Sequence, residues 1–368
     1  MKNSTSSGQL SVIIPVYNEA DNVTRVVAAL DKALVDVSWE VVFVDDHSPD
    51  NTSQIITDIA AHDQRVRLIH RVGRRGLSSA VIEGIMSSTA DFVAVMDGDL
   101  QHDETKLKEM LSAVSCSGDG GIDIAIGTRY TEGGSTGDWN YARKVMSKFA
   151  NWIAHKITRV ELKDPMSGFF LLRRDTFLNV VEGLSGLGFK ILLDILTTSK
   201  SPLKVAEIPY TFRVREAGES KLDALAAWDF TMLLIDKRLG QFVPARFVSF
   251  ACVGSFGIIV HFLVLTLGLE LGGLVFNWAH GLAAAVSMVS NYWLNNLLTY
   301  RDRRRRGRRW FSGLISFMAV CSLGGVANIG IASVLYSSNT HWLLSALAGV
   351  IIGAVWNYAA TALYTWRN

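Results

Sequence analysis

The sequence has few of the residues that form disulfide frameworks or zinc sites, and it has no recognisable secretion signal. Its three cysteines lie far apart in the 368-residue chain, so we expect neither kind of site. Residues 1–9 are polar and lack the apolar core of a cleaved signal peptide. No G-x-G-x-x-G motif follows the first apolar run, and no G-x-x-x-x-G-K-[ST] loop is present. These absences argue against a dinucleotide-binding fold and P-loop binding of ATP, so a nucleotide would have to bind through side chains.

An excess of one charge is also missing, because 36 Lys and Arg are balanced by 34 Asp and Glu, for a formal net charge of +2. The overall charge therefore indicates no particular partner. Composition changes along the chain instead. Charged and apolar residues are mixed up to about residue 240, and the chain after Arg246 is overwhelmingly apolar. A chain of this length can hold one sizeable soluble domain and a smaller second part. We predict two domains, residues 1–240 and residues 241–368.

The first domain alternates between apolar runs typical of strands and segments with helical spacing. Strands are predicted at residues 10–15, 39–44, 66–70 and 92–96, and helices at residues 20–34, 54–63 and 78–88. This alternation predicts a mostly parallel, Rossmann-like α/β sheet. Ligands of such sheets bind beyond the carboxyl ends of the strands. Polar residues follow three of these strands, at 15–19, 45–46 and 97–99, and we expect them to meet in one crevice.

The stretch that ends in Asp97 and Asp99 is the centre of this prediction. A buried strand gains nothing from two carboxylates one residue apart, because they repel each other and resist burial. A divalent cation between the carboxylates and an anionic ligand would relieve that repulsion. Oxygen ligands from Asp97, Asp99 and Gln101 suit Mg²⁺ or Mn²⁺. The alternative for such a motif on its own is a solvated, aspartate-rich turn after a strand.

Several motifs in a fixed order resemble those of a known enzyme family. Residues 12–19 (VIIPVYNE), 44–52 (VDDHSPDNT) and 96–102 (MDGDLQH) are similar to motifs of the family 2 glycosyltransferases, which have the GT-A fold. Within that family, residues 75–80 (RGLSSA), 127–130 (GTRY) and 218–222 (GESKL) resemble the dolichyl-phosphate mannose synthases. The resemblance covers about residues 10–235 and implies a GT-A domain.

The resemblance also implies a role for each of a set of site residues. The nucleoside of a sugar donor would be held by Pro15, Tyr17, Glu19, Val44 and Asp46. The metal and the donor diphosphate would be held by Asp97, the Gly98 backbone, Asp99 and Gln101. The acceptor phosphate would be held by Arg129, Arg143 and Ser147. The loop that closes over the donor phosphates would contribute Arg215 and Lys221. Asp97, Asp99 and Arg129 would be the catalytic residues.

Most of these residues also have an ordinary structural alternative. Tyr17 could pack against a strand, and Arg129 and Arg143 could be surface charges paired with carboxylates. Lys221 could be a solvated loop residue. For His102 the structural and functional interpretations are equally open. The order of the motifs favours a site over this set of separate explanations.

The implied reaction transfers mannose from GDP-mannose to a polyprenyl phosphate, of the dolichyl or undecaprenyl type, with inversion and with a metal. A cation on the leaving diphosphate and guanidinium groups on the acceptor would supply the charge that this transfer needs. An ionised phosphate requires no general base, which leaves Asp164 to orient the sugar or the metal. The same reaction with UDP-glucose or another nucleotide sugar is an alternative, and a lipid-linked sugar transporter is the non-enzymatic one. A processive polysaccharide synthase is not supported, because no Q-x-x-R-W segment is present.

Two segments have the pattern of helices that lie in a membrane interface. Residues 140–157 have an apolar face and several Lys and Arg, and residues 224–239 combine apolar and aromatic side chains just before the apolar part. Basic amphipathic helices bind lipid headgroups. An ordinary helix packed on its own sheet is the alternative.

Four apolar stretches, at residues 247–271, 275–300, 310–336 and 342–366, each exceed the ~20 residues needed to cross a bilayer. They predict an integral membrane protein with a four-helix transmembrane domain, which resembles the GtrA-like domain, notably at residues 291–296 (NYWLNN). Anchoring, homo-oligomerisation and movement of the lipid product are the open roles. Close helix contacts are expected at Gly254, Gly257, Gly324, Gly325, Gly349 and Gly353.

Basic residues mark one side of the predicted membrane domain. An arginine-rich run at 301–309 separates the second and third stretches, and the same side carries Lys237, Arg238, Arg246 and Arg367. Positive charge stays cytoplasmic, so we predict an N-in, C-in topology with a cytoplasmic catalytic domain. The position of the run beside the membrane favours anionic lipid over nucleic acid as its partner.

Overall fold

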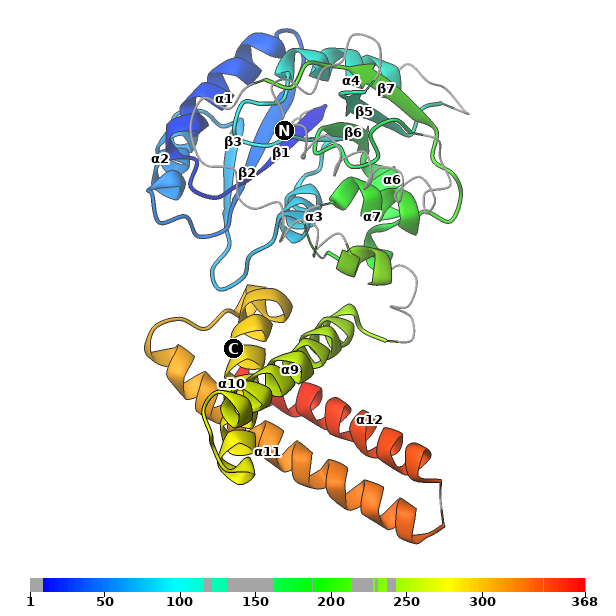
Figure 1. The fold of residues 1–368 in the computed structure, drawn as a ribbon. Helices are drawn as coiled ribbons and strands as arrows, with labels where there is room; N and C mark the ends of the chain where they lie inside the picture. The colour runs from blue at the N-terminus through cyan, green and yellow to red at the C-terminus, as the bar shows by residue number, and fades with distance from the viewer. Residues whose placement is uncertain are drawn as a thin grey trace, which may run out of the picture. The chain divides into compact units, whose positions relative to one another are not determined.

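The computed structural model describes residues 9–115, 121–130, 162–186, 188, 190–213, 228, 231–236, 243–339 and 341–367. It forms two compact units, Met1–Leu233 and Leu234–Asn368, which we name the α/β unit and the membrane unit. Figure 1 shows the strands in the first and the long helices in the second. Residues 140–157 and most of residues 224–239, with their predicted interfacial helices, lie outside the described residues.

A seven-stranded sheet forms the centre of the α/β unit, in the order β3-β2-β1-β4-β6-β5-β7. The strands are β1 Leu10–Val16, β2 Trp39–Asp45, β3 Val66–His70, β4 Phe92–Val95, β5 Ile124–Thr128, β6 Phe170–Arg173 and β7 Val205–Pro209. Strand β6 is antiparallel to its neighbours β4 and β5, and the other pairings are parallel. The prediction of a mostly parallel α/β sheet is confirmed.

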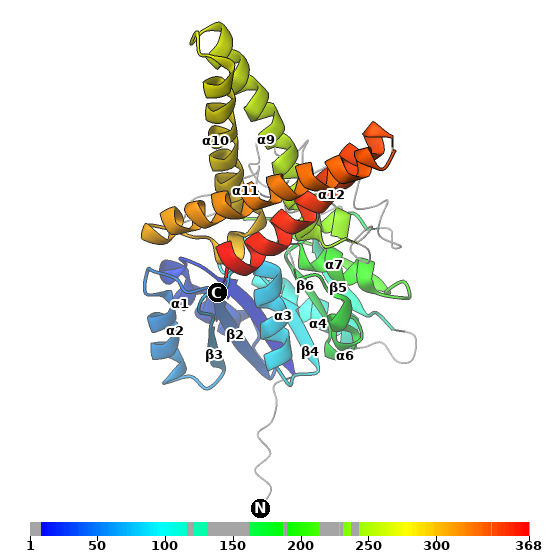
Figure 2. The same cartoon turned by 90° about the horizontal axis from the view of Figure 1, so that it is seen from below.

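Helices cover both faces of the sheet, as Figures 1 and 2 show. One face carries α1 Ala20–Ala33, α2 Thr52–Ala60 and α4 Leu107–Ser115, and the other carries α3 Leu77–Ser87, α6 Arg174–Leu178 and α7 Ile191–Thr198. Successive side chains of a strand point to opposite faces, so Val12 and Ile14 join the first core and Ile13 joins the second. Burial on both faces explains why the parallel strands are continuous apolar runs. The short helices η1 Glu104–Lys106 and η2 Val181–Gly183 complete the described elements of this unit.

The membrane unit consists of two helical hairpins. Helix α9 Ala245–Glu270 packs along α10 Phe276–Leu294, and α11 Arg308–Ser337 packs along α12 Trp342–Ala360. The π-helical segments η3 Asn295–Thr299 and η5 Thr361–Thr365 extend α10 and α12, and η4 Arg301–Arg303 follows η3. Five aromatic side chains join the hairpins in a buried cluster, namely Phe250, Tyr292, Tyr300, Phe317 and Trp366.

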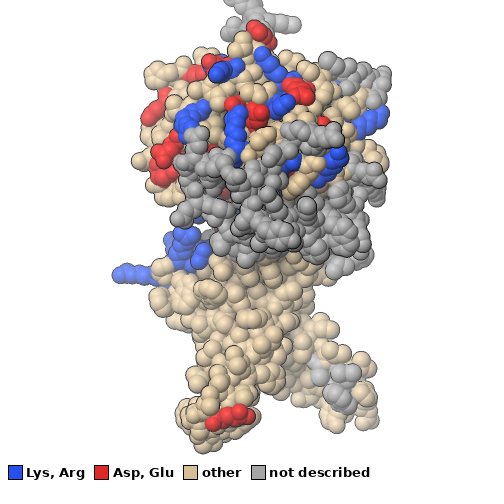
Figure 3. Space-filling model, turned by 45° about the horizontal axis from the view of Figure 1, so that its top comes forward, with Lys and Arg blue, Asp and Glu red and all other residues tan. Residues whose placement is uncertain are grey.

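Among the described residues, three segments are long and apolar enough to cross a membrane: Ala245–Glu270, Arg308–Ser337 and Leu347–Thr365. Helix α10 is not one of them, and it carries polar residues such as His280 and Asn291. The prediction of a membrane protein is thus supported, and the count of four spans stays a prediction. Figure 3 shows an almost uncharged surface over these helices, with the basic side chains gathered at one end.

The expected close contacts at glycines are found at four of six positions. A Cβ atom at Gly257, Gly324, Gly349 or Gly353 would meet a neighbouring helix within 3.4 Å. At Gly254 and Gly325 it would meet nothing within 4 Å, so the prediction is wrong at these two positions. Both face away from the neighbouring helices, and helical spacing alone did not separate the two kinds of glycine.

Candidate active site

The loops that follow the parallel strands meet at one edge of the sheet. Strands β1, β2 and β4 are parallel neighbours, so their carboxyl ends lie together. Strand β5 has the same direction, because both β4 and β5 are antiparallel to β6. Arg129 directly follows β5 and therefore lies at the edge where Asp46 and Asp97 leave β2 and β4.

Gly98 brings the two aspartates against the end of β1. A Cβ atom at this position would lie 3.0 Å from Val16 Cγ1 and 3.3 Å from Ile14 Cγ2, closer than most real contacts. It would also lie 4.0 Å from the Glu19 side chain. Glycine is therefore the residue that lets the loop of Asp97 and Asp99 pack beside the loop after β1.

His102 fixes the backbone of Asp97. The Asp97 N–H donates to His102 Nδ1 over 3.1 Å, and the ring stacks on Phe169 with its centroid 5.2 Å away. His102 is 2% exposed, and this burial lowers the pKa of its imidazole to about 4. The ring is therefore neutral at physiological pH, with its proton on Nε2. His102 therefore has a structural role, because it holds the backbone of Asp97 in place.

The loops after β1 and β2 are joined by hydrogen bonds. The backbone N–H of Asn18 donates to Ser48 Oγ over 3.0 Å, and that of Glu19 donates to Thr52 Oγ1 over 3.1 Å. In the adjacent strands, Pro15 is paired with Val44 in the sheet register. The five residues expected to hold a nucleoside therefore lie close together at this edge.

Asp46 lies against the loop that precedes α3. Its carboxylate accepts a hydrogen bond from the Gly76 N–H over 2.8 Å and forms an ion pair with Arg71 at 2.9 Å. Burial raises the pKa of Asp46, and the Gly76 N–H and Arg71 oppose that shift. In the same loop, the Arg75 guanidinium lies 4.4 Å from the centre of the Tyr17 ring. Sequence reasoning missed both arginine contacts, since only long-range packing creates them.

Arg129 forms a bidentate ion pair with Asp164. Its Nε donates to Oδ2 over 2.7 Å and its Nη2 donates to Oδ1 over 2.9 Å. The Arg129 side chain is 10% exposed and Asp164 is fully buried. The alternative that Arg129 is a surface charge paired with a carboxylate is therefore right about the carboxylate. It is wrong about the surface, because the pair is buried. Asp164 lies just before β6, and the antiparallel direction of β6 places it at the same edge.

Gln101 is tied to the segment after β7. Its Nε2 donates to the backbone oxygen of Arg213 over 3.0 Å, and its own N–H donates to Asp99 Oδ1 over 3.1 Å. The described residues contain no group of three or more His, Cys, Asp or Glu that could hold a metal. The expected set is smaller, with two carboxylates and one amide.

This set fits a hard divalent cation in the chemistry of its donors, which are all oxygen atoms. The absence of a side chain at Gly168 leaves room over the first carboxylate, since a Cβ atom there would lie 3.5 Å from Asp97 Oδ2. Asp97, Asp99 and Gln101 could therefore hold Mg²⁺ or Mn²⁺. The other expected residues, Arg143, Ser147, Arg215 and Lys221, lie outside the described residues.

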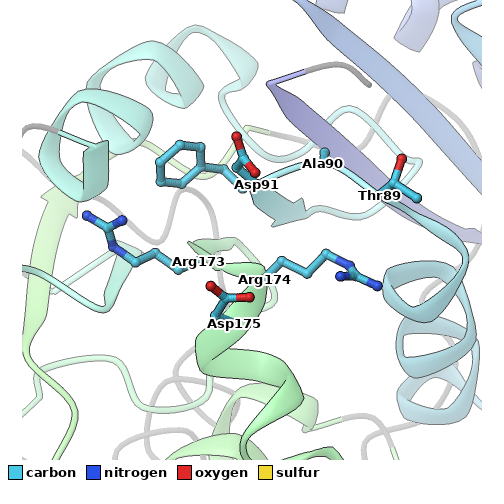
Figure 4. Close-up of a pocket in the computed structure, with 7 residues that line it drawn as sticks. Thr89, Ala90, Asp91, Arg173, Arg174 and Asp175 are labelled. Atoms are coloured by element: carbon cyan, nitrogen blue, oxygen red, sulfur yellow. The ribbon is translucent and has the colours of Figure 1, made fainter. Parts of the chain in front are cut away.

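A cavity lies at the opposite edge of the sheet, where β4 begins and β6 ends. Figure 4 shows its lining by residues 89–92 and 173–175, with the Arg173 and Arg174 side chains extending in opposite directions. The Arg174 N–H donates to the Asp91 backbone oxygen over 2.9 Å. This cavity is separate from the edge at which the strands carry the aspartates.

Comparisons with known proteins agree with both units. Residues 11–180 match the model of glycosyl transferase family 2, and residues 249–366 match the GtrA/DPMS transmembrane domain. The dolichol-phosphate mannosyltransferase of Pyrococcus furiosus is 35% identical over 364 residues, which cover 98% of this chain and 100% of that protein. The chain belongs to the dolichol-phosphate mannosyltransferase family.

Two other dolichol-phosphate mannosyltransferases match a smaller share of the chain. The Mycosarcoma maydis protein is 33% identical over 66% of this chain and 84% of its own length. The Saccharomyces cerevisiae protein is 34% identical over 58% of this chain and 81% of its own length. These matches confirm the predicted family, the GT-A class of the α/β unit and the identification of an enzyme, a glycosyltransferase.

Proposed function

We propose that this protein transfers mannose from GDP-mannose to a dolichyl- or undecaprenyl-type phosphate, with inversion and with bound Mg²⁺ or Mn²⁺. Similarity to dolichol-phosphate mannosyltransferases over nearly the whole chain supports mannosyl transfer to a polyprenyl phosphate. The observation that carries the finer proposal is the meeting of Asp97, Asp99 and Arg129 at one sheet edge. Carboxylates for a cation and a guanidinium for a phosphate are what this transfer requires at adjacent positions.

The chemistry follows from the charges of the two substrates. An ionised oxygen of the lipid phosphate attacks the anomeric carbon, the bond from that carbon to the diphosphate breaks, and GDP leaves with the electron pair. Attack from the opposite face converts an α-linked donor into a β-linked product. When bound, the cation offsets the negative charge that develops on the diphosphate. The phosphate nucleophile has no proton to lose, so no side chain has to act as a base.

The residues of this chain bind and orient the two substrates. Tyr17 and Asp46 would contact the nucleoside, and the Asp164 carboxylate would hold the Arg129 guanidinium toward the acceptor phosphate. Asp164 keeps both oxygens on Arg129, so it acts as a positioning residue. Arg143 and Ser147 would complete the acceptor site, and Arg215 and Lys221 the donor site.

The test measures transfer of labelled sugar into organic-extractable lipid by the purified full-length protein. Parallel reactions contain polyprenyl phosphate and GDP-mannose, UDP-glucose or another nucleotide sugar, with Mg²⁺, with Mn²⁺ or with a chelator. We expect label only from GDP-mannose, loss of transfer in the chelator, and a β-linked mannolipid. Transfer from UDP-glucose alone would refute the donor, and full activity in the chelator would refute the metal.

We also propose the N-in, C-in topology with four spans and a cytoplasmic catalytic domain. The clustering of Lys and Arg at one end of the membrane unit supports it. Single-cysteine variants at Gly273 and Arg304, made in a cysteine-free chain, would be exposed to an impermeant maleimide on intact cells. We expect labelling at residue 273 only. Labelling at both positions would show that α10 does not cross, and labelling at neither would show that the hairpin of α9 and α10 does not cross.

A further inference from the structure

Among the described residues, Arg213 makes four polar contacts, and all of them go to residues that follow Asp99. The Arg213 backbone N–H donates to the backbone oxygen of Gln101 over 2.9 Å. The Arg213 backbone oxygen accepts from the side-chain Nε2 of Gln101 over 3.0 Å. Its guanidinium pairs with Glu104 through Nη1 at 2.7 Å and with Asp103 through Nη2 at 2.9 Å. Arg213, which follows β7, therefore binds both ends of the segment 101–104. We call this set of contacts the clamp.

This clamp determines which end of the Gln101 amide is available to a ligand. A backbone oxygen accepts hydrogen bonds and cannot donate them, so the NH₂ end of the amide has to face Arg213. The Oε1 atom is left on the other side, as an oxygen ligand for a cation. A mobile amide would present nitrogen as often as oxygen.

The guanidinium also balances local charge. Asp103 and Glu104 follow the two aspartates within a few residues, and their side chains are only 21% and 11% exposed. Without Arg213, two further carboxylates would be left close to the site, free to repel the aspartates or to bind the cation in competing arrangements.

We infer that Arg213 is a positioning residue for the cation site: its guanidinium anchors the backbone at residue 213, and that backbone holds Gln101 with its amide oxygen toward the ion. This inference rests on the proposed function, because it presupposes a cation at Asp97, Asp99 and Gln101. Arg213 touches neither the cation nor the substrates in this role. Partners of metal ligands typically change metal affinity by about 10- to 100-fold when they are removed.

The chain contains a closely matched control arginine. Arg65 pairs with Asp31 at 2.7 Å and with Asp63 at 2.8 Å, and its side chain is 43% exposed, against 42% for Arg213. It contacts none of the residues predicted to hold the cation. Arg65→Gln and Arg213→Gln therefore remove similar ion pairs from the same unit.

The experiment measures Mn²⁺ binding to the full-length protein by electron paramagnetic resonance, without substrates, and thermal unfolding of the same samples. We expect Arg213→Gln to raise the Mn²⁺ dissociation constant about 10-fold, Arg213→Lys to raise it less, and Arg65→Gln to leave it unchanged. Should Arg213→Gln unfold, Arg213→Lys provides the same comparison.

The outcomes separate the inference from the proposed function. If Arg213→Gln and Arg213→Lys bind Mn²⁺ as the unmodified protein does, the role of Arg213 is refuted and the cation site stands. If the unmodified protein binds no Mn²⁺ that depends on Asp99, the cation site of the proposed function is itself refuted.

A second inference comes from the membrane unit, where the two hairpins share a pattern of residues. Ser249, Phe250 and Gly257 of α9 recur 67 residues later in α11 as Ser316, Phe317 and Gly324. The end of α10 recurs 66 residues later at the end of α12, as the following equivalent pairs: Asn291 and Asn357, Tyr292 and Tyr358, Thr299 and Thr365, Tyr300 and Trp366.

The equivalent residues make equivalent contacts within each hairpin. A Cβ atom at Gly257 would collide with the Asn291 amide, and one at Gly324 would collide with the Asn357 amide. Ser249 Oγ lies 2.7 Å from Thr299 Oγ1, and the equivalent distance from Ser316 to Thr365 is 3.1 Å. Both second helices also end in a π-helical segment.

The contacts between the hairpins are reciprocal. Tyr292 of the first hairpin lies 5.7 Å from Phe317 of the second, and Tyr358 of the second lies 5.8 Å from Phe250 of the first, between ring centroids. The equivalent residues Tyr300 and Trp366 stack on each other at 4.0 Å with 6° between their planes. Reciprocal contacts with one self-paired position are the mark of a two-fold interface.

We propose that the membrane unit is built from two copies of one helical hairpin, related by a pseudo-two-fold axis between Tyr300 and Trp366. In the first hairpin, Phe250, Tyr292 and Tyr300 form one face. This face packs against the equivalent face of the second hairpin. Substitutions at equivalent positions should therefore have equal effects.

The test compares thermal unfolding of full-length variants in detergent. Gly257→Ala and Gly324→Ala should lower the midpoint by similar amounts, whereas Gly254→Ala and Gly325→Ala, which meet no neighbour within 4 Å, should leave it within about 2 °C. The exchange Tyr300→Trp/Trp366→Tyr should retain most of the stability that Tyr300→Ala or Trp366→Ala loses. Unequal effects of the first pair, or an exchange as harmful as the alanine variants, would refute the duplication.

Discussion

Among the described residues, the α/β unit buries charged side chains as well as uncharged polar ones, whereas the polar side chains that the membrane unit buries are uncharged. The edge of the α/β sheet gathers charged groups, among them Asp46, Asp99 and the pair of Arg129 with Asp164. The region where the two membrane hairpins meet, which we call the joint, buries uncharged polar side chains. They are Ser249, Asn295, Asn296, Thr299, Thr361 and Thr365. Charge is expensive to bury unless it has an ion-pair partner or several hydrogen bonds, whereas amides and hydroxyls can satisfy one another between helices.

The largest effect is expected from Asp99→Asn at the sheet edge. Loss of one carboxylate at the proposed cation site should reduce transfer by about 10³-fold, or about 4 kcal/mol of activation free energy, with little change in thermal unfolding. The control is Asp58→Asn on α2, an exposed aspartate that pairs with Gln54 and should change neither. Equal activity of the two variants would contradict the assignment of the edge.

Asp164→Ala should have the largest effect on stability. It would leave the Arg129 guanidinium buried without its carboxylate. We expect this to lower the free energy of unfolding by about 3–5 kcal/mol. The double variant Arg129→Met/Asp164→Ala removes the unpaired charge and should regain part of the loss in denaturant unfolding, but not the activity. A single variant as stable as the unmodified protein would show that the pair is not buried.

A smaller effect is expected at the joint, from Asn296→Ala. The Asn296 amide bonds the backbone of Arg305 at 2.8 and 3.1 Å and accepts from Trp366 Nε1 over 3.3 Å. Its loss should lower the free energy of unfolding by about 2 kcal/mol and leave kcat unchanged. A drop in kcat with unchanged stability would show that Asn296 acts in the reaction and not only in the packing of the helices.

The smallest effect is expected from Ser249→Ala. Within the described part of the chain the hydroxyl bonds Thr299 Oγ1 alone, and such bonds between membrane helices average about 0.6 kcal/mol. Thermal unfolding in detergent should detect a shift of a few degrees at most, and Ser316→Ala should match it. A loss of several kcal/mol would mean that the joint depends on single hydroxyls.

The strands and the meeting of the loops could be predicted from the sequence, because parallel strands buried on two faces are apolar runs that end abruptly. Strands β1, β2 and β3 begin at the predicted residues, and β4 ends one residue early. The direction of β6 could not be predicted, since its pairing depends on residues far away in the chain. The partner of Arg129 was hidden for the same reason.

Arg71 and Arg213 were missed because nothing in their neighbourhood distinguishes them from surface arginines. Arg71 is 2% exposed because Asp46 and Glu83, from two other elements, approach it. Arg213 meets Asp103 and Glu104 from more than 100 residues away. Such contacts follow from the packing of the whole unit and leave no local pattern.

The reversed direction of β6 has a consequence for how this enzyme could change over evolution. Strand β5 ends at Thr128 and β6 begins at Phe170, and one ion pair joins Arg129 and Asp164, which lie 35 residues apart in the stretch between these strands. Whatever lies between them could lengthen, shorten or be exchanged while the seven strands keep their order. A change in residues 131–161 could therefore alter the acceptor site that we propose for Arg143 and Ser147, while the residues that we propose for the sugar donor stay the same.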